Sequence, residues 1–186
     1  MTQNLIKSVC VYCGSRMGKQ DSFQQSAIDL GRALADADLR LVYGAGDVGL
    51  MGAVANAAQS AGGQTFGVIP VHLLDQEVGK RDLTHFIITE NMHERKKVMV
   101  MNSDAFVLLP GGLGSLDEFF ELLTWRQLGL HEKHCVILNI DGYWDPMVTM
   151  IDHQIENGFV APHNRDFFTI CESVPAAMRV LNQVLS

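Results

Sequence analysis

The sequence lacks any apolar run that approaches the roughly 20 residues of a bilayer-spanning helix. Its first residues also lack the apolar core of a signal peptide. Positive charge is scarce, because 14 Lys and Arg stand against 21 Asp and Glu, for a net charge of -7. That balance disfavours a broad nucleic-acid-binding surface but allows a local pocket for a small anion. We therefore expect a cytoplasmic protein with neither a membrane nor a nucleic-acid partner.

Patterns for metal binding and redox chemistry are also missing. Cys10 and Cys13 have Cys-x-x-Cys spacing, but no second pair completes a zinc site. Cys10 lies in an apolar strand pattern, whereas a redox pair is expected at a helix start. The seven histidines form no His-x-x-x-His pair. We predict buried, reduced cysteines and no metal site.

What is present indicates an α/β fold. The 186 residues suit one domain over residues 1–186, with 47% hydrophobic residues, 19% charged residues and 17 glycines. Short apolar runs alternate with longer segments of helical periodicity, which predicts a Rossmann-like, doubly wound parallel sheet with helices on both faces. Residues 72–84 are polar enough for an ordered loop or a lid. Strands are expected at residues 8–12, 39–43, 65–69, 85–89, 105–109, 135–140 and 168–171, and helices at 22–37, before Gly62, from 91, after Ser115, at 145–156 and from 175.

Three expected strands end in loops rich in glycine or small polar residues, at residues 14–16, 44–52 and 111–115. In an open parallel sheet such loops meet at the carboxyl ends of the strands, where main-chain amides and helix N-termini bind phosphate. The dinucleotide fingerprint fits poorly, and no Gly-Lys-Ser/Thr sequence follows a glycine loop. A nucleoside monophosphate therefore fits better than NAD or ATP.

The loop after the fifth expected strand is the most informative stretch. Glycines at 111, 112 and 114 leave the main chain unshielded, so that successive amides can converge on an anion. Ser115 adds a hydroxyl and Glu118 a carboxylate. The spacing Ser115-x-x-Glu118 also matches a capping box that closes the first turn of a helix, and spacing alone slightly favours this structural role for Glu118. Leu116, Phe120 and Leu123 are expected on one face of that helix.

Residues 110–118, Pro-Gly-Gly-x-Gly-Ser-x-x-Glu, closely resemble the Pro-Gly-Gly-x-Gly-Thr-x-x-Glu signature of the Lonely Guy family, the cytokinin riboside 5'-monophosphate phosphoribohydrolases. Residues 11–16, 41–52, 92–96 and 124–131 resemble further family segments in family order, and together the likeness covers most of residues 8–160. The chain departs from the family pattern at Ser115, where Thr is usual, at Asp117, where Glu is common, and at Ala45, where Gly is common.

The resemblance implies hydrolysis of the N-glycosidic bond of a nucleoside 5'-monophosphate by a homodimer that uses no metal or organic cofactor. It implies Glu118 and Arg95 as the catalytic residues. From the residues alone, Arg95 beside Lys96 and Lys97 reads as a solvated helix face, and Met92 is equally an ordinary core methionine. The substrate-binding residues implied are Ser15, Arg16, Gly44, Met92, Gly111, Gly112, Leu113, Gly114 and Ser115.

Two other functions stay open at this point. A nucleotide-binding or cofactor-carrying protein of Rossmann-like fold would hold a monophosphate without cleaving it, and would not need both Arg95 and Glu118. Members of the family are often labelled lysine decarboxylases, but the sequence offers no evident lysine for pyridoxal phosphate.

Overall fold

The computed structural model describes residues 7–74 and 79–186. A seven-stranded, fully parallel sheet has the order β4-β3-β2-β1-β5-β6-β7. The strands are β1 (Ser8–Tyr12), β2 (Arg40–Tyr43), β3 (Thr65–Pro70), β4 (His85–Thr89), β5 (Ala105–Leu108), β6 (Cys135–Leu138) and β7 (Phe168–Cys171). The α-helices are α1 (Asp21–Asp36), α2 (Gly49–Ser60), α3 (Met92–Met101), α4 (Leu113–Gln127), α5 (Asp145–Glu156) and α6 (Val174–Leu185), with short 3₁₀ turns η1 (Val71–Leu73), η2 (Ile140–Gly142) and η3 (Pro162–Phe167).

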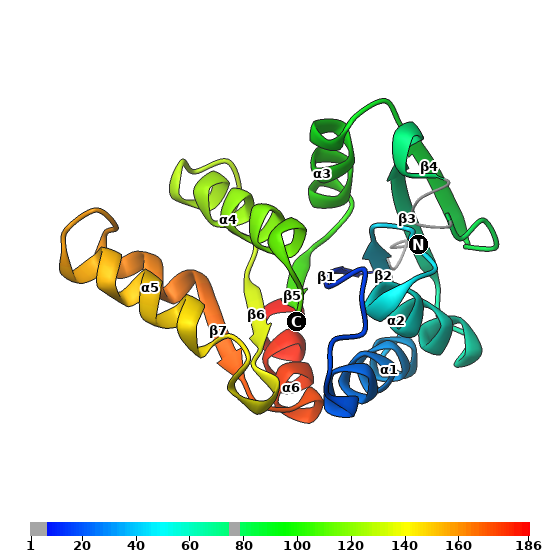
Figure 1. The fold of residues 1–186 in the computed structure, drawn as a ribbon, viewed down its shortest axis with the longest axis horizontal. Helices are drawn as coiled ribbons and strands as arrows, with labels where there is room; N and C mark the ends of the chain where they lie inside the picture. The colour runs from blue at the N-terminus through cyan, green and yellow to red at the C-terminus, as the bar shows by residue number, and fades with distance from the viewer. Residues whose placement is uncertain (1–6, 75–78) are drawn as a thin grey trace.

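Helices cover both faces of the sheet, as the sequence predicts (Figure 1). Successive strand residues point to opposite faces, so Val9 and Val11 pack on α1, α2 and α6, while Cys10 and Tyr12 pack on the side of α3, α4 and α5. The central strands β1, β5 and β6 are almost continuously apolar because both of their faces are buried, whereas the edge strand β4 is mostly exposed. All four cysteines are buried. Within the described residues, no helix is long and apolar enough to cross a membrane.

Helix α4 differs from expectation at its start and in its buried face. It begins at Leu113, with Gly112 as N-cap and no side-chain cap, so Ser115 lies inside the first turn. The capping-box alternative is therefore wrong. Phe119 and Leu122 are the fully buried apolar residues of this helix. The face expected to be buried, with Leu116, Phe120 and Leu123, is only half-buried. Both faces of this helix are apolar, so periodicity alone does not identify the one that meets the sheet.

Candidate active site

The site lies where the strand order reverses, between β1 and β5. The chain leaves β1 toward α1 on one face of the sheet and leaves β5 toward α4 on the other. This divergence opens a crevice at the carboxyl ends of the two strands. The two loops are joined at its base, since the Gly14 amide donates a hydrogen bond of 3.0 Å to the Pro110 carbonyl.

The glycine loop after β2 closes against the loop after β1. The Leu50 amide donates to the Gly14 carbonyl at 3.0 Å. Gly49 has a φ of +57°, and a Cβ there would lie 2.2 Å from the carbonyl carbon of Ser15. Only glycine suits this conformation and this close approach. The structure thus brings together the three loops that the sequence singles out.

A cavity of about 630 Å³ occupies the crevice, a size suited to a nucleotide. Every residue expected at the site lines it, including both candidate catalytic residues. They are Ser15, Arg16, Gly44, Met92, Arg95, Gly111, Gly112, Leu113, Gly114, Ser115 and Glu118.

Arg95 is buried, with 4% of its surface exposed, so its reading as a solvated helix face is wrong. It enters from α3, and its guanidinium is oriented by a carbonyl within β3 and by the carbonyl of the residue that follows β2. Nε donates to the Val68 carbonyl at 3.1 Å and Nη2 to the Gly44 carbonyl at 2.7 Å, while Nη1 lies 3.8 Å from the sulfur of Met92. A Cβ on Gly44 would lie 2.0 Å from Nη2, so this glycine leaves the space that the guanidinium occupies.

Glu118 lies on the second turn of α4 and lines the cavity together with Arg95. Ser115, one turn earlier, is buried, and its side chain lies against Gly111, where a Cβ would be 2.1 Å from Oγ. By contrast, Cβ atoms at Gly112 and Gly114 would have no atom within 4 Å. The first turn of α4 therefore offers main-chain amides to open space, with a carboxylate one turn further along.

An ion-pair cluster joins α3 to α4 beside these residues. The Lys96 ammonium lies 2.9 Å from Asp117 Oδ2 and 2.9 Å from Glu121 Oε2, and its side chain is 5% exposed. Burial alone would lower the pKa of Lys96, but hydrogen bonds and ion pairs with the two carboxylates outweigh burial and raise it. The lysine therefore stays charged and holds the two helices that carry Arg95 and Glu118.

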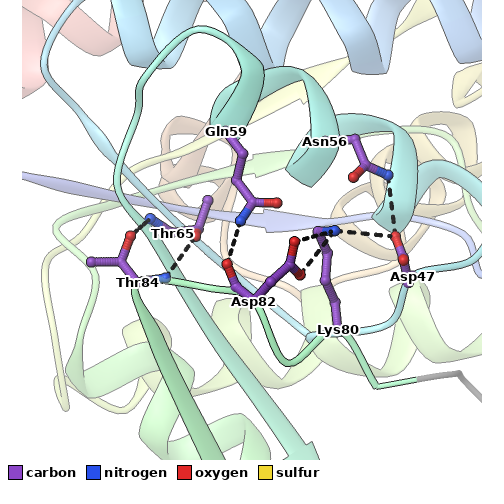
Figure 2. A network of polar contacts seen from close by, with 7 residues as sticks. All are labelled: Asp47, Asn56, Gln59, Thr65, Lys80, Asp82 and Thr84. Carbon is purple, nitrogen blue, oxygen red and sulfur yellow. Dashed lines mark hydrogen bonds and ion pairs between the residues drawn. The ribbon is translucent and has the colours of Figure 1, made fainter.

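In the segment expected to form a loop or lid, residues 79–84 are held by hydrogen bonds and ion pairs (Figure 2). The Lys80 ammonium lies 3.0 Å from Asp82 and 3.8 Å from Asp47, and its amide donates to the Ala45 carbonyl at 2.8 Å. The hydrogen bond from Lys80 lowers the pKa of Asp82. Residues 79–84 thus buttress the loop that backs Arg95, and Leu73 of η1 lines the cavity. Residues 75–78 of the expected lid lie outside the described residues.

Sequence reasoning missed Tyr143, which reaches the cavity from the turn after β6. Its hydroxyl donates to the Gly111 carbonyl at 2.5 Å. Its position after a strand end was the only available signal, because the contact links residues 32 positions apart. In the described part of the chain, no three His, Cys, Asp or Glu residues are placed to hold a metal ion.

Comparison with known proteins finds relatives along nearly the whole chain. A family model described as "possible lysine decarboxylase" matches residues 51–181. A cytokinin riboside 5'-monophosphate phosphoribohydrolase of Arabidopsis thaliana is 40% identical over 184 residues, which cover 99% of this chain and 79% of the relative. The chain belongs to the Lonely Guy family. A second cytokinin riboside 5'-monophosphate phosphoribohydrolase, from Rhodococcoides fascians, is 43% identical over 176 residues, which cover 94% of this chain and 89% of the relative.

Solved structures outside these close Lonely Guy relatives share the fold. The molybdenum cofactor carrier protein of Chlamydomonas reinhardtii superposes with a TM-score of 0.74 at 19% identity, over 97% of this chain and 98% of that one. DNA processing protein A of Helicobacter pylori superposes with a TM-score of 0.59 at 16% identity, over 95% and 80%. At such identities the likeness concerns the fold alone.

Proposed function

We propose that this chain, acting as one domain, hydrolyses the N-glycosidic bond of a nucleoside 5'-monophosphate, such as AMP or isopentenyladenosine monophosphate. The products are the free base and ribose 5-phosphate. The activity for which relatives at about 40% identity are named supports this reaction class. The observation that carries the proposal is that Arg95 and Glu118 line one cavity with the glycine loop of residues 111–115.

Glu118 is the proposed catalytic carboxylate. Cleavage of the bond between C1' and the base builds positive charge on the ribose ring, and a carboxylate beside C1' stabilises that charge or activates the attacking water. The water adds to C1', its proton leaves with the base, and the ribose keeps its phosphate. Arg95 stays protonated, which suits it to polarise the departing base or to orient Glu118 rather than to donate a proton.

The phosphate is proposed to bind at the first turn of α4. The positive end of this helix of 15 residues and its unbonded amides favour an anion there. The residues proposed to hold the phosphate are Gly111, Gly112, Leu113, Gly114 and Ser115. Ser15 and Arg16, two exposed residues of the loop between β1 and α1, also line the cavity. The base is proposed to lie against Met92, next to the buried Met51 and Met99 and close to Gly44.

We also propose that the protein is a homodimer that pairs through α4. An apolar groove runs along the outer face of this helix, with two carboxylates at its edge. Partly buried leucine and aromatic side chains on a helix surface are typical of a face that a partner covers. The groove is lined by Leu116, Asp117, Phe120, Glu121, Thr124 and Trp125. A cytoplasmic location stays a prediction from the sequence.

Two alternatives have less support. Decarboxylation with pyridoxal phosphate needs a lysine that forms a Schiff base, and no lysine is among the described residues that line the cavity. A carrier that binds a nucleotide without cleaving it shares the fold, but its function does not require Arg95 and Glu118 in one cavity.

The deciding experiment incubates the purified protein with AMP and with isopentenyladenosine 5'-monophosphate and quantifies free base and ribose 5-phosphate by chromatography. We expect release from at least one substrate. The Glu118→Gln variant should still bind the nucleotide in calorimetry but release base at least 100-fold more slowly. Tight binding without release by the wild-type protein would favour the carrier instead.

A further inference from the structure

Tyr143 makes a short hydrogen bond to the loop proposed to bind phosphate. It follows η2 at the carboxyl end of β6, and its hydroxyl donates to the Gly111 carbonyl at 2.5 Å. Gly111 and Gly112 are the two residues between Pro110 and the start of α4. The contact therefore falls on the hinge between strand and helix, at the wall of the cavity.

The tyrosine ring is itself held in place. It packs edge-on against Phe23 of α1, with 5.3 Å between ring centroids, and against Trp144 at 4.8 Å. The Trp144 amide donates at 2.7 Å to the side chain of Asn139, which is buried at the end of β6. Tyr143 is 40% exposed, but its ring is braced by Phe23 of α1 on one side and by Trp144 on the other.

The hydrogen bond that holds the Gly111 carbonyl also orients the Gly112 amide, because both belong to one peptide group. The peptide between Gly111 and Gly112 is planar and trans, so its N–H points opposite to its C=O. Packing constrains only one end of this peptide, because a Cβ on Gly111 would lie 2.1 Å from Ser115 Oγ, whereas a Cβ on Gly112 would touch nothing within 4 Å. The hydrogen bond from Tyr143 adds a fixed direction for the carbonyl, and hence for the amide, of this peptide.

We propose that Tyr143 is a positioning residue for phosphate recognition, whose hydroxyl aims the Gly112 amide at the 5'-phosphate of the substrate. This inference rests on the proposed function. It deepens that function by naming a residue that distinguishes a nucleoside monophosphate from a nucleoside. Tyr143 acts through the Gly111–Gly112 peptide, and the phosphate itself is held by the amides of the loop.

The test compares Tyr143→Phe with wild type in calorimetric binding and in steady-state kinetics. The variant keeps the ring and removes only the hydroxyl. We expect the Kd and KM for AMP to rise roughly tenfold, kcat to change by less than about threefold, and the Kd for adenosine to stay unchanged. Tyr43→Phe is the matched control, because the buried Tyr43 hydroxyl has no hydrogen-bond partner among the described residues.

Several outcomes would overturn the inference. Unchanged AMP binding in Tyr143→Phe, with active wild-type enzyme, would remove the positioning role and leave the proposed function standing. An equal loss of affinity for AMP and adenosine would indicate a general structural role. If the wild-type protein binds AMP without releasing base, the proposed hydrolase fails, and the ratio of AMP to adenosine affinity still decides the role of Tyr143.

Discussion

Gly44 and Arg95 share one small volume at the carboxyl end of β2. The carbonyl of the glycine accepts a hydrogen bond from the guanidinium, and its missing side chain leaves room for the same group. Glycine is required here by a close approach and not by backbone conformation, because Gly44 is not among the positive-φ residues. A single methyl group is therefore enough to displace the arginine.

We expect Gly44→Ala to lower kcat/KM for AMP by at least 100-fold while the fold is kept, because the new Cβ would lie 2.0 Å from Nη2 of Arg95. Kinetic assays with circular dichroism would measure both effects. Ala45→Gly, on the same loop but outside the cavity lining, should alter kcat/KM by less than about threefold. Full activity in Gly44→Ala would contradict the placement of Arg95.

At the scale of elements, the alignment of α3 with α4 decides how the two proposed catalytic residues face each other. Arg95 and Lys96 are adjacent on α3, and Lys96 is bonded to carboxylates on both sides of Glu118 along α4. Neighbouring residues on a helix point about 100° apart, so one side chain can enter the cavity while the next joins the helices. The spacing between catalytic groups thus depends on a contact outside the cavity.

Lys96→Met should reduce kcat more than it raises KM. It should also lower the free energy of unfolding by about 1–2 kcal/mol. The cost stays modest because the Asp117 carboxylate is exposed to water, which solvates it once the lysine is gone. The pKa of Lys96 is raised in the folded protein, so its ion pairs stabilise the fold fully at any pH below 10.5, the ordinary pKa of lysine. This stabilisation is lost only as the pH rises through the folded pKa. The deficit should therefore be constant from pH 6 to pH 9 in urea denaturation. Lys97, the exposed neighbour, provides a control: Lys97→Met should change neither kcat nor the free energy of unfolding.

A pH-sensitive contact lies where α4 returns to β6. The Lys133 amide donates to His131 Nδ1 at 3.2 Å, so Nε2 must carry the proton that faces the Leu122 carbonyl at 3.1 Å. Only the neutral ring satisfies both bonds, and burial lowers the pKa of His131. The unfolded chain therefore binds a proton near pH 6.5 that the folded chain rejects, which makes stability fall on acidification.

The free energy of unfolding should accordingly decrease between pH 7 and pH 5, measured by urea denaturation. His131→Gln keeps a donor for the Leu122 carbonyl and does not titrate, so its curve should be flatter over this range. His134, whose pKa burial also lowers, remains in both proteins and cancels in the comparison. Parallel curves for wild type and variant would exclude His131 as the titrating group.

At the scale of the molecule, the two faces of the sheet are covered unequally. Helices α1, α2 and α6 pack together over one face, whereas α3, α4 and α5 stand further apart over the other (Figure 1). Helix α4 buries Phe119 and Leu122 on the sheet and leaves Phe120 and Trp125 in an outer groove. The outer face of α4 is the surface that we propose a second copy covers.

Thr124→Glu should convert the proposed dimer to monomer in sedimentation velocity, because it adds a negative charge to a groove that already carries Asp117 and Glu121. Thr149→Glu on α5 is a matched control. Both threonines are exposed and bond the carbonyl four residues earlier, at 2.7 Å and 2.9 Å. A wild-type monomer, or a dimer that survives Thr124→Glu, would refute pairing through this groove.

Much of the fold was predictable because its signals are local. Each strand is a short apolar run that stops at glycine, proline or a polar residue, and the three glycine loops follow strands that the topology makes neighbours. The start of α4 was not predictable, since Ser115 and Glu118 have the spacing of a cap and nothing local shows that the helix begins at Leu113. The contact of Tyr143 with Gly111 was not predictable either, because it depends on the packing of β5 beside β6.

Because the cavity lies at the reversal between β1 and β5, occupancy by a ligand should raise the thermal stability of the protein. A ligand there touches loops that belong to both halves of the sheet, so it cannot stay bound while either half is unfolded. Ligand binding therefore raises the free energy of unfolding of the whole domain, by about 2.7 kcal/mol when the free ligand is at 100 times its Kd. A rise in melting temperature consequently reports which nucleotides the cavity accepts, even in variants that have lost catalysis.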